Sequence, residues 1–140
     1  MSGTTPIQKP AAVEGAEQIA SIRAGVAALC ARFDGAYWRE KDRERAYPTE
    51  FVRALTEAGY LAALIPESYG GSGLGLAAAA AILEEIHKSG GNSAACHAQM
   101  YIMGTILRYG SEAQKRTYLP RIATGELRLQ AFGVTEPSAG

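Results

Sequence analysis

Apolar residues recur every three or four positions along most of this chain, a spacing that places them on one face of an α-helix. Near the start, Ile19, Ile22, Val26, Leu29 and Phe33 form one such stripe, which predicts a helix over residues 14–33. Proline and glycine divide the rest of the chain into further helical stretches. These are predicted from Pro48 to about Gly59, from Leu76 to Lys88, from Asn92 to about Tyr109, and from Ser111 to about Gly125. The pattern predicts an all-α domain of five or six helices.

Several residues mark where these helices begin. Pro48 suits a first helical turn, Asn92 can cap the helix that follows it, and Ser111 with Gln114 forms a capping-box pattern. In the helix from Leu76 to Lys88, the residues expected to face inward are Leu76, Ile82, Leu83 and Ile86.

Polar and glycine-rich stretches connect the predicted helices. Residues 1–13 are expected to be a flexible arm, because they are polar and contain two prolines and a glycine. Residues 37–45 carry mixed charges and predict a solvated connection whose aromatic side chains touch the core, or else a partner-binding patch. Residues 61–66 are expected to cross the domain in an extended conformation. The glycines of residues 70–73 then indicate a tight turn, because their spacing matches neither a dinucleotide-binding motif nor a P-loop.

Charge and hydrophobicity exclude two classes of partner. Lysine and arginine total 14, as do aspartate and glutamate, so no net field attracts nucleic acid or an anionic membrane. The longest apolar stretch, Leu74–Leu83, is too short to span a bilayer. The polar start, Met1–Lys9, lacks the apolar core of a signal peptide. We therefore expect a cytoplasmic protein with no membrane or nucleic-acid partner.

The two cysteines are expected to be reduced structural thiols. Cys30 and Cys96 lie in apolar helical contexts without the paired spacing of a metal or redox motif. A zinc site built from His87, Cys96 and His97 is disfavoured, because their spacing matches no zinc finger.

The hydrophobic period changes from helical to alternating close to the end of the chain. Apolar residues at positions 127, 129 and 131 alternate with Arg128 and Gln130, which predicts a short extended segment leading to Thr135. The Thr135 hydroxyl and free backbone N–H groups there could donate hydrogen bonds to a ligand. Pro137 and the small residues after it leave room for a close approach. The alternative is an ordinary turn after a strand.

Three stretches resemble a single protein family in order and spacing. Phe132–Gly140 is similar to the Thr-Glu-Pro-x-Ala-Gly-Ser-Asp segment of the acyl-CoA dehydrogenase family. Leu64–Leu74 resembles the family's Ile-Pro-Glu-x-Tyr-Gly-Gly-x-Gly-Leu stretch, and Tyr109–Glu126 resembles the segment that precedes its flavin loop. The resemblance covers Pro48–Gly140. Before Pro48 it extends only to a helix followed by a polar connection.

This resemblance implies a fold, a cofactor and a set of contacts. Residues 14–130 would form the orthogonal multi-helix N-terminal domain of acyl-CoA dehydrogenases, and residues 131–140 would start the flavin-binding segment, which is cut at Gly140 before the family's Ser and Asp. The implied cofactor is FAD. The residues expected to contact it are Phe132, Gly133, Val134, Thr135 and Gly140.

The helix predicted over residues 92–109 corresponds to the one that lines the family's acyl pocket. The matched positions lie close to Ser93 and His97, which are therefore candidate substrate contacts. Ala94, Ala95, Ala98 and Gly104 would leave room for a slender ligand, and His97, Met100, Tyr101 and Met103 are expected to project around it. The alternative for His97 is an ordinary core or surface histidine.

The family's reaction removes the α-proton of an acyl-CoA thioester while hydride passes from the β-carbon to flavin N5, which gives the 2,3-enoyl thioester. Electrons then go to an electron-transfer flavoprotein, and a neighbouring subunit completes the flavin site, which implies a homo-oligomer. The family's catalytic base, a glutamate, would lie beyond Gly140, so no residue of this chain is assigned a catalytic role. The alternatives are a flavin oxidase or monooxygenase of the same fold and a non-catalytic helical interaction module.

Overall fold

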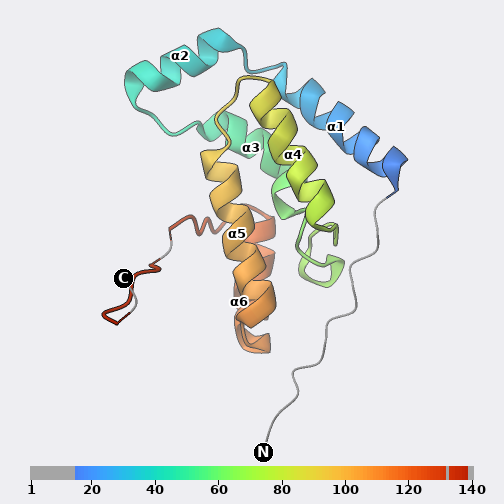
Figure 1. The fold of residues 1–140 in the computed structure, drawn as a ribbon, viewed down its shortest axis with the longest axis vertical. Coiled ribbons are helices and arrows are strands. Elements are labelled where there is room, and N and C mark those ends of the chain that lie inside the picture. Colours follow the sequence, from blue (N-terminus) through green and yellow to red (C-terminus); the bar gives the residue numbers. More distant parts are fainter. Residues whose placement is uncertain (1–14, 132, 139–140) are drawn as a thin grey trace, which may run out of the picture.

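The computed structural model describes residues 15–131 and 133–138. Six α-helices account for most of this part of the chain (Figure 1). They are α1 (Ala16–Cys30), α2 (Gly35–Glu44), α3 (Thr49–Glu57), α4 (Leu76–Lys88), α5 (Ala94–Tyr109) and α6 (Glu112–Ala123), with two short 3-10 turns, η1 (Tyr60–Ala62) and η2 (Glu67–Tyr69), between α3 and α4. No β-strand occurs among the described residues, and the all-α prediction is confirmed. None of the helices in this part combines the length and apolar content needed to cross a bilayer.

Side chains that the sequence singles out bond to the backbone at the start of the last two helices, although the N-cap of α5 itself, Ser93, makes no side-chain cap bond. The Ser111 hydroxyl accepts a hydrogen bond from the Gln114 backbone N–H at 3.2 Å, and the Gln114 side chain accepts one from the Ser111 backbone N–H at 2.8 Å. This reciprocal pair confirms the capping box of α6. Ahead of α5, the Asn92 side-chain oxygen accepts from the Ala94 N–H at 2.9 Å.

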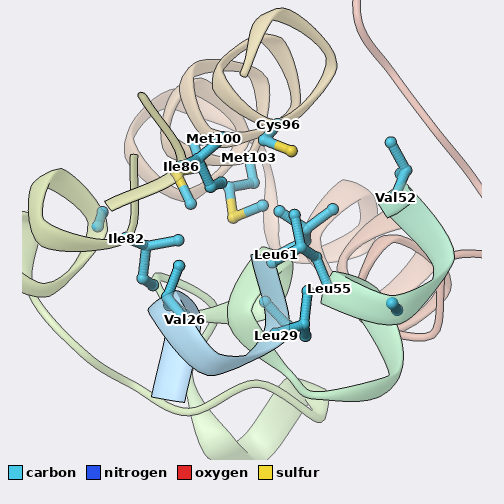
Figure 2. Close-up of a cluster of buried hydrophobic side chains, with 14 of the residues drawn as sticks. Val26, Leu29, Val52, Leu55, Leu61, Ile82, Ile86, Cys96, Met100 and Met103 are labelled. Carbon is cyan, nitrogen blue, oxygen red and sulfur yellow. The ribbon is translucent and has the colours of Figure 1, made fainter. Parts of the chain in front are cut away.

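One hydrophobic core joins α1, α3, α4 and α5 (Figure 2). α1 runs beside α4, and α5 lies next to α6 (Figure 1). The labelled side chains of the core come from all four helices and from η1: Val26 and Leu29, Val52 and Leu55, Leu61, Ile82 and Ile86, and Cys96, Met100 and Met103. α6 adds Leu119 and Ile122. The predicted helical stripes therefore meet in a single core.

Residues 37–45 are solvated as predicted, but they largely form a helix, α2, so the prediction of a mere connection is wrong. Asp34 starts this helix, because one of its carboxylate oxygens accepts from the backbone N–H groups of Ala36 and Tyr37 at 2.9 and 3.0 Å. All ten residues of α2 stay at least partly exposed. The aromatic side chains do touch the core, as expected, and the Trp38 ring lies 4.8 Å from the Phe51 ring.

The stretch 61–66 does not cross the domain in an extended conformation. It forms η1 and further turns, with Ile65 N–H bonded to Ala62 O at 3.1 Å. A short apolar run of this kind predicts burial but cannot distinguish a strand from turns buried on every side. The tight turn predicted at residues 70–73 is confirmed, since Gly70 N–H bonds to Glu67 O at 2.9 Å and both Gly70 and Gly73 have positive φ angles. Leu76, predicted to face inward, is 78% exposed at the first position of α4.

The segment that follows α6 runs back to α5 and then leaves the helices. Leu127 and Leu129 pack against the core, and residues 133–138 are exposed. In Figure 1 this last part projects away from the bundle. The described part of the segment forms neither a further helix nor a β-strand, so its extended conformation stays a prediction.

Candidate functional site

Arg128 attaches the terminal segment to the buried face of the domain. Its guanidinium donates to the Gln99 side-chain oxygen at 3.3 Å and to the Thr56 hydroxyl at 3.2 Å. Gln99, only 1% exposed, uses its amide nitrogen to donate to the Leu61 carbonyl at 3.3 Å. Arg128 therefore joins the segment to both α3 and α5 through a chain of satisfied polar groups.

Gln130 makes a second attachment, two residues further along. Its side-chain nitrogen donates to the Ala95 carbonyl at 2.9 Å and to the Tyr47 hydroxyl at 3.0 Å. Its own backbone carbonyl accepts from the Tyr101 hydroxyl at 3.2 Å. Both the side chain and the backbone of this residue are thus held, by α5 and by the loop between α2 and α3.

Beyond this attachment lie the residues expected to contact a flavin. Gly133, Val134 and Thr135 are exposed, and apart from Gly133 and its two chain neighbours no residue has an atom within 4 Å of the point where a Cβ on Gly133 would stand. Phe132 and Gly140, the other two expected contacts, lie outside the described residues. The arrangement leaves the Thr135 hydroxyl and the backbone around Gly133 accessible to a ligand.

A groove of about 460 Å³ follows the N-terminal half of α5. Three of the small residues predicted to leave room for a ligand, Ala94, Ala95 and Ala98, line it on the helix side. Residues of the loop between α2 and α3 line the opposite side of the groove, and the side chain of Gln130 forms a further part of its wall. The remaining lining residues are Arg45, Ala46, Tyr47, Pro48 and Asn92.

Other residues of α5 lie elsewhere than predicted. Met100 and Met103 are buried in the core and do not project around a ligand. Gly104 does not line the groove beside Ala98. A second groove of about 420 Å³ lies further along α5, against α6 and the side chain of Leu129. Sequence spacing alone could not assign these faces, because one helix does not show which neighbours cover it.

His97 and Ser93, the two candidate substrate contacts, lie in different surroundings. His97 is exposed, and its ring meets the Tyr101 ring edge to face with centroids 5.2 Å apart. Ser93 is 5% exposed, and its hydroxyl lies 2.6 Å from Nε2 of His87 on α4. The structure therefore brings His97 beside Tyr101. It places the Ser93 hydroxyl toward α4.

The cysteines and histidines do not converge. Cys96 is fully buried, and burial raises the pKa of its thiol to about 12, so a thiolate ligand or nucleophile at this position would be costly. Both Cys96 and Cys30 are free thiols in the core. Among the described residues, no three His, Cys, Asp or Glu side chains gather as metal ligands.

Sequence analysis missed the attachment made by Arg128, Gln130 and Tyr101. It used the first two only as the polar half of an alternating pattern. A usable indication was present: long polar side chains between leucines that must face the core suggest hydrogen bonds to neighbouring elements. Their partners could not be predicted, because Thr56 and Tyr47 lie more than 70 residues away in the sequence.

Comparison with known proteins gives the family. The model of the acyl-CoA dehydrogenase N-terminal domain matches residues 16–126. Glutaryl-CoA dehydrogenase of Desulfococcus multivorans is 42% identical over 105 residues, 71% of this chain and 26% of that protein. Acyl-CoA dehydrogenase FadE12 of Mycobacterium tuberculosis is 33% identical over 125 residues, 89% of this chain and 32% of that protein.

A solved structure described as an electron transferring flavoprotein of Acidaminococcus fermentans has the same arrangement. It superposes on 91% of this chain with a TM-score of 0.74, at 29% identity and over 34% of its own chain. The chain thus spans between a quarter and a third of the length of the curated relatives described above. It belongs to the acyl-CoA dehydrogenase family, whose N-terminal domain it carries.

Proposed function

We propose that this chain forms the N-terminal helical portion of a flavin-dependent acyl-CoA dehydrogenase, whose intact form converts an acyl-CoA thioester into the 2,3-enoyl-CoA. One observation supports this best. The segment that leads to the expected flavin contacts is bonded to the same helix, α5, that lines the groove, through Gln130 and the Ala95 carbonyl. An acyl chain in the groove and a flavin at the end of the segment would then lie close together, as hydride transfer requires.

In this proposal the exposed segment around Thr135 binds the flavin, and FAD is the cofactor. A flavin supplies the hydride acceptor. The Thr135 hydroxyl and adjacent backbone N–H groups would donate hydrogen bonds to its electron-rich edge, which favours the reduced form. The open space at Gly133 fits a ligand that approaches the backbone.

The groove along α5 would hold the acyl chain. Alanine side chains line its helix side, so methylene groups could enter it, and each buried methylene contributes about 0.8 kcal/mol. His97, exposed next to Ala98, would shape the acyl site without taking part in proton transfer. Ser93 stays a candidate contact. Its hydroxyl would first have to leave the His87 ring.

Family resemblance alone supports several further parts of the proposal. Electrons would pass to an electron-transfer flavoprotein, and the intact protein would be a homo-oligomer that acts in fatty acid metabolism. Residues 14–130 would be the helical domain, and residues 131–140 the start of the flavin-binding segment.

The test uses the product of the full reading frame that contains these 140 residues. We expect the purified protein to carry a yellow flavin that acyl-CoA bleaches under anaerobic conditions, with enoyl-CoA as the product. A colourless protein that binds no added FAD would favour the interaction module. Rapid hydrogen peroxide formation in air with acyl-CoA would favour an oxidase instead.

A further inference from the structure

We propose that Arg128 and Gln130 are positioning residues, which fix the terminal segment across α5 and thereby place Thr135 for the flavin. We call these two side chains and their hydrogen-bond partners Thr56, Gln99, Ala95, Tyr47 and Tyr101 the polar latch. The inference rests on the proposed flavin function. It goes beyond that function by naming residues that do not touch the flavin themselves.

The hydrogen bonds of Arg128 fix the direction of the terminal segment and add little to the stability of the fold. Its guanidinium is partly buried and donates to two neutral oxygens, on Gln99 and Thr56. Partial burial of a charge against neutral acceptors brings little net stabilisation, and an apolar side chain of similar size could fill the same space. A planar guanidinium bonded at two points does, however, fix the direction of the chain that carries it.

The Gln130 arm fixes the register of the segment. Its amide donates to one acceptor on α5 and to another on the loop before α3, while its backbone carbonyl accepts from Tyr101. A slip of one residue in either direction would bring Leu129 or Ala131 to this place, and neither side chain carries an amide. The three bonds therefore specify which residue lies at this point of α5.

The latch is also the last side-chain attachment to the helices, within the described residues, before Thr135. Thr135 follows Gln130 by five residues, and residues 133–135 are exposed. A slip of one residue would move the Thr135 hydroxyl by roughly 3.4 Å, the rise per residue of an extended chain. A hydrogen bond tolerates only a few tenths of an ångström, so such a slip would remove the contact with a flavin.

The latch shares a wall with the proposed acyl groove. Gln130 lines that groove, and the Ala95 carbonyl that it binds belongs to the same turn of α5 as the lining residues Ala94 and Ala98. Tyr101, which holds the Gln130 carbonyl, also meets the His97 ring. The groove and the segment that leads to Thr135 are thus fixed relative to each other by the same few bonds.

The test measures flavin affinity and flavin reduction potential in the full-length protein. Gln130→Met removes the amide donors at nearly constant volume, and we expect the flavin Kd to rise about three- to tenfold, with a shifted potential. Tyr101→Phe removes a single hydroxyl and should act in the same direction with a smaller effect. Because the latch acts through Thr135, Gln130→Met should add little to the effect of Thr135→Val when the two are combined.

A matched control is Thr117→Val, which removes a hydroxyl bonded to the Ala113 carbonyl on α6, away from the segment, and should leave flavin binding unchanged. The inference is overturned if Gln130→Met and Tyr101→Phe lower the melting temperature but leave Kd and potential as they were. Full additivity with Thr135→Val overturns it as well. A full-length protein that binds no flavin at all overturns the proposed function and the latch together.

Discussion

Gly71 lies so close to Ile65 that a side chain in its place would force the turn to move. A Cβ on Gly71 would stand 2.0 Å from the Ile65 carbonyl oxygen and 2.5 Å from the Ile65 Cβ. Gly104, in contrast, lies inside α5, and apart from its chain neighbours and the helix's own backbone no atom lies within 4 Å of the corresponding point. The two glycines therefore have opposite roles: the first allows a close approach of two backbone segments, and the second only weakens a helix.

This contrast gives a paired prediction for alanine substitutions. We expect Gly71→Ala to destabilise the protein by roughly 1–3 kcal/mol, because the turn must move away from Ile65. Gly104→Ala should stabilise it by up to about 1 kcal/mol, because alanine is the better helix former. Thermal unfolding of the two variants beside the wild type is the measurement. Equal melting temperatures for both variants would show that the turn at residues 70–73 can move away from Ile65 at little cost in free energy.

At the scale of single elements, the sequence predicts best those helices that carry both an apolar stripe and a local stop. α4 has the predicted bounds, Leu76–Lys88, and α6 begins at the predicted capping box. α2 was missed because its charges outnumber its apolar residues, so that its stability depends on the Asp34 cap and on contacts of two aromatic rings. Such contacts belong to tertiary structure, which the local pattern does not contain.

Ion pairs connect α1 to α4, and their contribution to the stability of the fold can be measured as a function of pH. Arg23 on α1 lies 2.5 Å from a Glu84 oxygen and 2.7 Å from a Glu85 oxygen on α4, and Lys88 adds to both pairs. The hydrogen bonds from Arg23 are the main reason why the pKa values of both carboxyl groups are lowered from 4.5, with Lys88 the next cause. Carboxylates with lowered pKa values stabilise the folded state above pH 4.5 and lose this contribution as the pH falls through the lowered values.

We therefore expect Arg23→Met to lower the melting temperature at neutral pH by a small amount, because Arg23 is only partly buried and Glu84 is exposed, so that solvent screens the contact. The difference from the wild type should shrink as the pH falls below about 4.5, where the carboxylates become protonated. Melting curves between pH 7 and pH 3 at low salt are the measurement. The control is Arg39→Met on α2, which should give a difference that does not depend on this pH range.

At the scale of the whole molecule, the candidate site is assembled from parts that are far apart in the sequence. The groove combines the loop 45–48, the start of α5 and Gln130. Its helix side, Ala94, Ala95 and Ala98, could be predicted from the run of small residues. The other walls could not, because they depend on how the terminal segment returns from α6 to α5 and on the course of the loop after α2. For the same reason the sequence left open on which face of α5 His97 lies.

Because three separate stretches of the chain close the groove, a larger side chain on one wall should shorten it without unfolding the protein. In the full-length enzyme we expect Ala98→Leu to lower kcat/KM for long acyl-CoAs more than for short ones, since each excluded methylene forfeits about 0.8 kcal/mol of binding. His97→Ala should shift the chain-length profile while the best substrate keeps its rate within about tenfold, because His97 shapes the site without transferring a proton.

Ala80→Leu on the exposed side of α4 is the matched control and should leave the profile unchanged. If Ala98→Leu lowers kcat/KM equally at every chain length, α5 supports the fold and does not line the acyl site. If His97→Ala lowers kcat alone, this histidine takes part in the chemistry.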